Sequence, residues 1–490
     1  MNSIFEQING ILGSVFFFDI FFGSMEGTSM PFIVAWLIVG GVFLTFRFGF
    51  INVRMFSHAF KIIMGKYKTA DDVGEITPFQ SLTTALSATV GLGNIAGVAI
   101  AIAIGGPGAT FWMILAGFFG MTLKFTEVTL AQLYRETRPD GRIMGGAMQY
   151  LSKGLAAKGH AKLGRVLAII FAVLAIGGSL GAGNAFQTSQ ALGVVSENIP
   201  FFKEYPIVFG LLIASIVGFV IIGGIKRIAK TAEKIVPLMV FIYLVAALWI
   251  LAVNASAVPD AISLIFHEAF APTAAAGGLI GVLVQGFKRA AFSSEAGIGS
   301  AAIVHSTAAV KYPVRQGMVA LYEPFIDTIV ICSMTALVIV TTGVYAADGE
   351  FANLVASKQG AALTSAAFGT VISWFPIILS FSIVLFAFST MISWSYYGER
   401  SWTYLFGEKY TLAYKLMFVS FTVIASVTSA SALLDFSDLL ILSMALPNLI
   451  GLYILQGEVS SNLKEYLAKW KSGELDRECI DSGVCEPEKK

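Results

Sequence analysis

A cluster of glycines interrupts an apolar segment near residue 90. The stretch from Ser87 to Gly97 reads SATVGLGNIAG, and the polar side chains of Thr89 and Asn94 lie among its three glycines. Each interior glycine costs a helix about 1 kcal/mol, so the pattern favours a local break in the helix. Close packing against a neighbouring helix is the alternative, since small residues are common where membrane helices meet.

A helix that opens inside a bilayer leaves peptide groups bare, which is costly unless a ligand or another helix satisfies them. The exposed N–H groups would suit a carboxylate at the positive end of the following half-helix, as an amino acid would supply. Glycine also allows the backbone to approach such a ligand closely. The candidate substrate-binding residues in the break are therefore Thr89, Gly91, Leu92, Gly93 and Asn94.

Carbonyl groups that point away from such a break suit a hard cation such as sodium. We expect the carbonyls of Ser87 and Val90 to be joined by hydroxyls from another helix, and the best placed in the sequence are Ser389 and Thr390. Membrane serines and threonines more commonly bond back to their own preceding turn, which is the alternative role.

A second run of glycines, from Gly277 to Gly286, reads GGLIGVLVQG. It predicts either a second break or close packing, and the sequence does not choose between them. Gln285 in this run is a candidate substrate contact. Asn184 and Gln187 are two more, because they are three positions apart and share a helix face; buried amides of this kind bind either a neighbouring helix or a substrate.

Bulk and charge complete the candidate set. Trp394 would close the pocket against longer side chains, although an aromatic residue near a helix end can instead anchor the helix at the interface. Two pairs of charged residues share helix faces, namely Lys124 with Glu127 and Glu323 with Asp327. We interpret both pairs as structural or gating networks. Neither glycine run has an acid or a histidine beside its glycines, which favours sodium over a proton as the coupling ion.

The elements that position these residues are membrane helices. The chain has 490 residues, of which 56% are hydrophobic and 13% charged, with a mean hydropathy of +0.77. This composition excludes a soluble protein, and nucleic acid is not an expected ligand. Spans of about 20 apolar residues are predicted at about eleven places, with ten and twelve as alternative counts: 31–46, 82–104, 109–131, 166–190, 205–224, 235–253, 274–287, 316–342, 371–396, 416–433 and 436–456.

Basic residues set the predicted orientation. With the N-terminus outside and the C-terminus in the cytoplasm, all but three of the 32 Lys and Arg residues lie on the cytoplasmic side; Lys124 is in a span, and Lys203 and Lys358 are outside. We therefore predict an all-α, multi-pass protein of the plasma membrane.

One extra N-terminal helix precedes ten spans that divide into two groups of five. Because five is odd, the two groups run in opposite senses, which is the pattern of inverted repeats with discontinuous first helices. The predicted parts are 1–80 (lead-in, extra helix and cytoplasmic loop), 81–253 and 254–456 (the repeats) and 457–490 (a cytoplasmic tail). This layout indicates a secondary transporter.

Other classes of protein fit less well. A membrane enzyme needs a nucleophile with a base, or metal ligands, at membrane depth, and the sequence has no such cluster. A channel gains nothing from paired broken helices, and a sensor usually carries a signalling domain. A proton-coupled or differently selective amino-acid carrier remains the main alternative. No cofactor, metal other than sodium, or obligate protein partner is expected; the partners are a small amino acid, sodium and the bilayer.

Three long strings resemble the alanine or glycine:cation symporter family. They are VGLGNIAGVAIAIAIGGPGATFWMILAGFFGMTLKFTEVTLAQLYR from Val90, AFSSEAGIGSAAIVHSTAAVKYPVRQGMVALYEPFIDT from Ala291, and ISWSYYGER from Ile392. The resemblance covers roughly residues 31–460 and implies a fold of the leucine-transporter type with sodium-driven uptake of alanine or glycine. It also implies that Asn94 faces both substrate and sodium, that Val90 offers its carbonyl to sodium, and that Gln187 contacts the substrate. Ser294 departs from the family pattern, which has Asn there.

Overall fold

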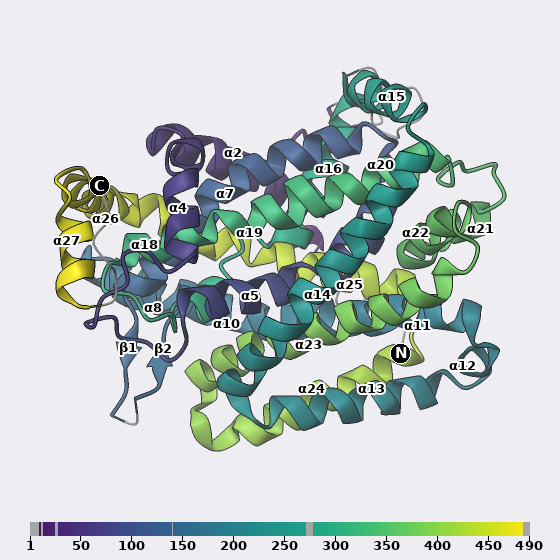
Figure 1. The fold of residues 1–490 in the computed structure, drawn as a ribbon. Helices are drawn as coiled ribbons and strands as arrows, with labels where there is room; N and C mark the ends of the chain where they lie inside the picture. Colours follow the sequence, from purple (N-terminus) through teal and green to yellow (C-terminus); the bar gives the residue numbers. More distant parts are fainter. Residues whose placement is uncertain (1–8, 11–12, 25–27, 140, 271–277, 484–490) are drawn as a thin grey trace.

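The computed structural model describes residues 9–10, 13–24, 28–139, 141–270 and 278–483, and long helices make up most of it (Figure 1). The N-terminal part contains α2 (Phe32–Arg47), α3 (Ile51–Arg54) and α4 (Phe56–Ile63). Residues 78–253 form α5 (Pro78–Thr89), η1 (Gly93–Gly97), α6 (Val98–Gly105), α7 (Ala109–Leu133), β1 (Glu136–Thr137), β2 (Ile143–Met144), α8 (Ala147–Gln149), η2 (Tyr150–Gly154), α9 (Leu155–Ala157), α10 (Ala161–Leu180), η3 (Gly181–Ala185), α11 (Phe186–Asn198), α12 (Pro200–Glu204), α13 (Pro206–Ile221) and α14 (Gly224–Val253).

Residues 258–481 form the remaining elements: α15 (Val258–Phe270), α16 (Gly278–Ser294), α17 (Ala302–His305), α18 (Pro313–Ala320), α19 (Tyr322–Pro324), η4 (Phe325–Cys332), α20 (Ser333–Thr342), α21 (Ala352–Ala356), α22 (Gly360–Gly369), α23 (Phe375–Phe406), η5 (Glu408–Tyr410), α24 (Thr411–Ser426), α25 (Ala430–Ser443), α26 (Ala445–Lys471) and α27 (Glu474–Asp481). Strands β1 and β2 form a short antiparallel hairpin in which Glu136 lies opposite Met144.

Within the described ranges, six helices or continuous runs of helices are long and apolar enough to cross a membrane. They are Ala109–Leu133, Ala161–Asn198, Gly224–Val253, Pro313–Thr342, Phe375–Phe406 and Ala430–Lys471. A seventh candidate is the pair Pro78–Thr89 and Gly93–Gly105, which is bent by 49° at its break. Phe32–Arg47 and Pro206–Ile221 are shorter apolar helices. The predicted all-helical class and the break near residue 90 are therefore confirmed.

The second predicted break is wrong in position. Helix α16 is continuous from Gly278 to Ser294, and Gly277 lies outside the described residues. The glycine at 286 serves packing instead, because a methyl group there would come within 2.6 Å of the Ala109 carbonyl on α7. The chain leaves the helical path after Ser294, where Glu295, Gly297 and Gly299 have φ values of +56°, +88° and +82°. Glycine adopts such values without a steric cost, so Gly297 and Gly299 let the chain continue along this path once Glu295 has left the helix.

Helices from the two halves of the chain pack against one another. Helix α7 contacts α16 and α18, α10 contacts α23, α13 contacts α24, and α14 contacts both α5 and α23. In Figure 1, α13 and α24 lie side by side along one edge, and α2 and α7 lie along the opposite edge. Hairpin β1–β2, α4 and α27 gather at one end of the helices, and α12, α15 and α21 at the other. Helices α5, α16 and α23 carry the candidate site between these ends.

Candidate functional site

Helix α5 has a capping box at its N-terminus and stops at the glycine cluster at its C-terminus. Thr77 accepts the backbone N–H of Gln80, the Gln80 side chain accepts the Thr77 N–H, and Pro78 occupies the first turn. At the other end the helix stops at Thr89, and Val90 turns away with φ −74° and ψ 87°. The capping box thus stabilises the N-terminus of this half-helix, and the glycines after Thr89 allow the helix to end inside the protein.

Side-chain amides satisfy two N–H groups in the break. The N–H of Gly91 donates to Oδ1 of Asn94 (2.9 Å), and the N–H of Leu92 donates to Oε1 of Gln187 on α11 (3.3 Å). Both amides are buried, and Leu92 is fully buried. An amide oxygen at the Leu92 N–H occupies the kind of position that a carboxylate oxygen would take.

Glycines bring the break into close contact with two other helices. A methyl group at Gly91 would lie 2.2 Å from Oγ1 of Thr390 on α23, and one at Gly93 would lie 3.1 Å from Cα of Ser293 on α16. Gly97, in the same segment, has nothing within 4 Å of that position. A side chain larger than that of glycine would therefore clash at Gly91 and Gly93 but not at Gly97.

The predicted sodium-binding residues meet where α5 packs on α23. Thr390 Oγ1 donates to the Ser87 carbonyl (3.1 Å), and Ser87 Oγ donates to the Ser389 carbonyl (2.8 Å). Ser389 Oγ, however, bonds back to the carbonyl of Phe386 in its own helix (2.9 Å). Thr390 therefore offers its hydroxyl toward the break, next to Gly91, whereas the Ser389 hydroxyl has the ordinary role inside its helix.

Some predicted substrate contacts lie elsewhere. Asn184 binds α24, donating to the Phe418 carbonyl (2.7 Å) and accepting from Thr422 Oγ1 (3.0 Å). Gln285 packs beside Gly105, where α6 ends, with 3.0 Å between its Cβ and a methyl group placed at that glycine. Thr89 Oγ1 bonds back to the Ala85 carbonyl (3.2 Å). The structure thus gathers Gln187 at the break and leaves Asn184 and Gln285 outside it.

Asp327 lies at the break, although the sequence suggested only a partnership with Glu323. Its carboxylate accepts Nδ2 of Asn94 (2.5 Å), Oγ of Ser293 (2.9 Å) and Oγ1 of Thr328 (2.7 Å). The side chain is fully buried within η4. The signal for this role was present, since an acid inside the apolar run 325–332 is a candidate functional residue by itself.

Lys124 pairs across helices rather than with Glu127. Its Nζ lies 3.0 Å from Oε1 of Glu323, whose other oxygen lies 3.3 Å from Nε2 of His305. Glu127 instead accepts Nδ2 of Asn448 on α26 (2.7 Å). All of these ionisable side chains have no solvent exposure. The direct partners of Lys124 and Glu127 therefore come from neighbouring helices, and the role of both same-helix pairs as structural or gating networks stays a prediction.

Trp394 is buried inside the protein rather than placed at an interface. It lies four residues after Thr390, on the same face of α23, and packs against Gly178 and Gly183. Its indole Nε1 donates to Oε1 of Glu295 (2.7 Å), the residue at which α16 ends. Glu295 thus places an acid where α16 ends, outside the glycine run 277–286 that the sequence made the candidate for a second break.

Comparison with known proteins identifies the family. The sequence profile described as "Sodium:alanine symporter family" matches residues 17–480. The chain belongs to this family. It is therefore a symporter rather than an enzyme, and it is a multi-pass membrane protein.

Two curated relatives of this symporter illustrate the range of the family. The sodium/alanine symporter AgcS of Methanococcus maripaludis is 40% identical over 437 residues, covering 89% of this chain and 94% of that one. The probable sodium/glutamine symporter GlnT of Bacillus subtilis is 34% identical over 446 residues, covering 90% and 89%.

Among solved structures, the symporter resembles MhsT, crystallised in complex with L-phenylalanine. The TM-score is 0.54 at 14% identity, over 78% of this chain and 98% of that chain. At this identity the likeness establishes a shared fold only.

Proposed function

We propose that this symporter imports a small neutral amino acid, alanine or glycine, together with sodium by alternating access. The bend of 49° at the glycine break carries the proposal, because it offers peptide N–H groups to a ligand inside the protein. The relative from Methanococcus, which is named a sodium/alanine symporter, agrees with this substrate class.

The substrate carboxylate would replace the Gln187 oxygen at the Leu92 N–H. That bond is 3.3 Å long in the structure, so Gln187 can exchange it for the ligand at little cost. Trp394, one turn from Thr390, would limit the size of the substrate side chain; since each methylene alters binding by only about 1–3 kcal/mol, exclusion of long side chains needs direct steric overlap. The proposed substrate-binding residues are Thr89, Gly91, Leu92, Gly93, Asn94, Gln187 and Trp394.

Sodium would bind between α5 and α23. The Ser87 carbonyl already accepts the Thr390 hydroxyl at 3.1 Å, so both oxygens are close enough to share a cation after a small rotation of the hydroxyl. The Val90 carbonyl and Ser389 complete the proposed set. Asn94 and Ser293 hold the Asp327 carboxylate at the break, which adds a negative charge suited to a second cation.

The proposed topology has eleven spans in the plasma membrane, with the N-terminus outside and the C-terminus in the cytoplasm. One extra helix precedes inverted repeats at 81–253 and 254–456. The breaks after Thr89 and after Ser294 each interrupt the first long helix of a repeat, which supports this layout.

Proton coupling is the second candidate. Buried acids lie at both breaks, Asp327 beside Asn94 and Glu295 beside Trp394, and a buried carboxylate near a transport site can carry a proton. A larger neutral amino acid is the alternative substrate, because the relative from Bacillus is named a probable sodium/glutamine symporter.

Counterflow in proteoliposomes tests the coupling ion and the substrate together. Labelled alanine should accumulate when sodium is present and fail to accumulate when potassium replaces sodium under an imposed proton gradient. Competition by glycine, alanine, glutamine and leucine then ranks the substrates. Accumulation driven by protons without sodium would replace this proposal with the second candidate.

Two substitutions test the site itself. Asn94→Ala should abolish uptake because it removes both the Gly91 contact and the Asp327 contact, while monodisperse elution shows that folding survives. Asp327→Asn keeps the size of the side chain and its ability to form hydrogen bonds, but it removes the negative charge. Uptake by this variant should therefore depend less on sodium, while the protein yield stays close to that of the wild type. Wild-type transport by Asn94→Ala would exclude Asn94 from the site.

A further inference from the structure

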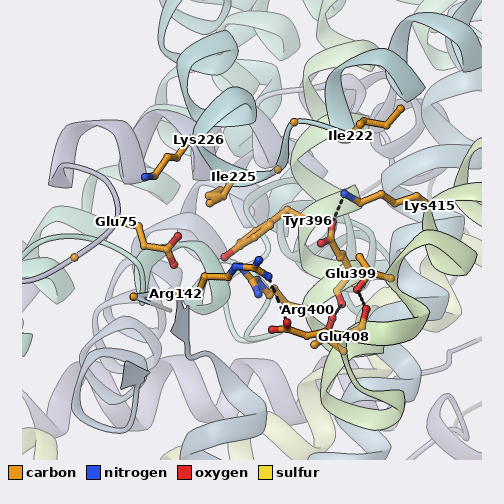
Figure 2. A pocket seen from close by; sticks show the side chains of 16 residues that line it. Glu75, Arg142, Ile222, Ile225, Lys226, Tyr396, Glu399, Arg400, Glu408 and Lys415 are labelled. Atoms are coloured by element: carbon orange, nitrogen blue, oxygen red, sulfur yellow. Dashed lines mark hydrogen bonds and ion pairs between the residues drawn. The ribbon is translucent and has the colours of Figure 1, made fainter. Parts of the chain in front are cut away.

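A polar cavity of about 810 Å³ opens at the end of the helices where the basic loops lie (Figure 2). It is lined by the ends of α14, α23 and α24 and by the chain just before α5. One of its lining residues, Arg400, follows Thr390 on α23 by ten residues, which places it about 15 Å along the helix from the break. The cavity is therefore separate from the central site and lies closer to the C-terminal end of the same helix.

Most charged groups around the cavity are already paired. Glu399 lies 3.3 Å from Lys415, and Glu408 lies 3.4 Å from Arg142 and also pairs with Arg138. Arg400 differs from them. It is only 8% exposed, forms no ion pair among the described residues, and its Nε has no hydrogen-bond partner in that part of the chain.

The direct contacts of Arg400 among the described residues include no carboxylate. Nη1 lies 3.3 Å from Sδ of Met144, and the guanidinium lies over the ring of Tyr396 at 4.9 Å from its centre. Thioether and ring contacts position a guanidinium without neutralising it. A buried guanidinium without a direct ion pair is costly, because Glu75 and Glu399 act on it only from a distance; an anionic ligand in the cavity would reduce that cost.

Two helix N-termini add to the positive potential. Helix α14, 30 residues long, begins at Gly224 on the cavity wall, and α24, 16 residues long, begins there at Thr411. Each N-terminus carries partial positive charge from its aligned peptide groups. Lys226, exposed on the wall, supplies a further ammonium.

Of the three carboxylates that line the cavity, Glu75 is the one with no ion pair in the described part of the chain. Glu75 lines the cavity, and its Oε1 holds the N–H of Ile143 in the hairpin at 2.7 Å. No ion pair joins Glu75 to Arg400 in the described structure, although Figure 2 draws both at the same cavity. A guanidinium and a carboxylate held apart across a polar cavity match the two ends of a zwitterion.

We propose that this cavity is a second, weaker site for the transported amino acid, with Arg400 binding its carboxylate and Glu75 its ammonium group. The inference rests on the proposed function, whose topology makes this face cytoplasmic. The site would receive the amino acid after it leaves the central site, and its lack of sodium ligands from α5 makes its binding independent of sodium.

Equilibrium dialysis of labelled alanine against the full-length protein in lipid nanodiscs tests the proposal. The wild type should show a tight component that needs sodium and a weaker component that persists in potassium. Arg400→Gln should weaken only the second component, by about ten- to a hundredfold, as expected for loss of a charged hydrogen-bonded pair. Its retained sodium-dependent component would also show that the variant is folded.

Matched variants keep the test decisive if Arg400→Gln does not fold. Lys226→Gln should weaken the sodium-independent component a few fold, whereas Lys230→Gln, exposed on the same helix outside the cavity, should leave it unchanged. Glu75→Gln should remove the preference for alanine over propionate, which lacks the ammonium group. Equal displacement of alanine by propionate or inorganic phosphate in the wild type would overturn the zwitterion site.

The two proposals fail in different ways. Loss of every sodium-dependent component from the wild type would contradict the proposed function. A normal sodium-dependent component without a weaker second one, or with a second one that Arg400→Gln and Lys226→Gln leave intact, would refute the cavity site alone.

Discussion

The indole of Trp394 donates a 2.7 Å hydrogen bond to the carboxylate of Glu295, and both side chains are at most 1% exposed. The bond joins the middle of α23 to the residue at which α16 ends. Trp394, which we propose limits the size of the substrate side chain, is thereby linked directly to the second break.

Trp394→Phe should lower the free energy of unfolding by about 1–3 kcal/mol, because a buried carboxylate oxygen loses its donor. The same change should allow larger side chains into the site and raise competition by leucine. Thermal unfolding in detergent and competition uptake measure the two effects. Trp374→Phe, at a position 62% exposed, is the control and should change neither.

Removal of Lys124 should be far more damaging than removal of a surface lysine. Lys124→Met leaves Glu323 buried beside His305 without its cation, and loss of one partner from a buried pair costs about 3–5 kcal/mol. Lys311→Met breaks an exposed contact with Asp71 and should cost less than about 1 kcal/mol.

The double variant Lys124→Met/Glu323→Gln separates charge from packing. It should recover much of the stability lost in Lys124→Met, because the remaining side chain is neutral. Additive losses in thermal unfolding would contradict a direct pairing of the two residues.

Gly91→Ala should abolish sodium-dependent uptake. The added methyl group would meet Thr390 Oγ1 at 2.2 Å, so the hydroxyl must turn away from the Ser87 carbonyl that it now contacts. Gly97 lies five residues after Leu92, and a methyl group added there would meet no other atom within 4 Å. The Gly97→Ala variant should therefore transport alanine normally. Sodium titrations of alanine uptake distinguish the two variants; similar sodium dependence in both would exclude this close approach from the cation site.

Gln187 and Asn184 should affect different properties. Gln187→Ala removes the amide that we propose contacts the substrate after the carboxylate has displaced it from the Leu92 N–H, so alanine binding should weaken at least about tenfold, with little change in thermal stability. Asn184→Ala breaks the link to Phe418 and Thr422 and should cost about 1–3 kcal/mol of stability. If Asn184→Ala instead weakened binding and Gln187→Ala instead lowered stability, the two roles would have to be exchanged.

His58, in the segment between the first two predicted spans, should make stability depend on pH. Burial, with repulsion from Lys61 and Lys66, lowers its pKa to about 4, below the unfolded value of about 6.5. The unfolded chain therefore takes up the proton first, so this stabilisation is complete above pH about 6.5 and falls as the pH drops toward 4, by up to about 3 kcal/mol.

The His58 prediction is checked by unfolding scans across this pH range. His58→Gln keeps a group able to bond Tyr466 Oη, which lies 3.0 Å from Nε2, and should flatten the profile. His160→Gln, at an exposed position, should leave the slope as it is in the wild type.

The sequence alone determined the features that depend on local pattern. Apolar runs separated by basic loops set the class of protein, because the cost of burying charge in a bilayer acts on each segment by itself. The break near residue 90 was predictable for the same reason, since Gly91 and Gly93 weaken a helix wherever it packs.

Only the tertiary structure decided which faces meet. A helical repeat shows that Lys124 and Glu127 share a face, but it does not show that Glu323 comes closer from another helix. Likewise, the candidate second break predicted from the sequence comprised the glycines of 277–286 but not Gly297 and Gly299. Close packing on α7 uses the glycine at 286 in a continuous helix, whereas Gly297 and Gly299 adopt positive φ values and interrupt the chain, because a glycine's role depends on what lies against it.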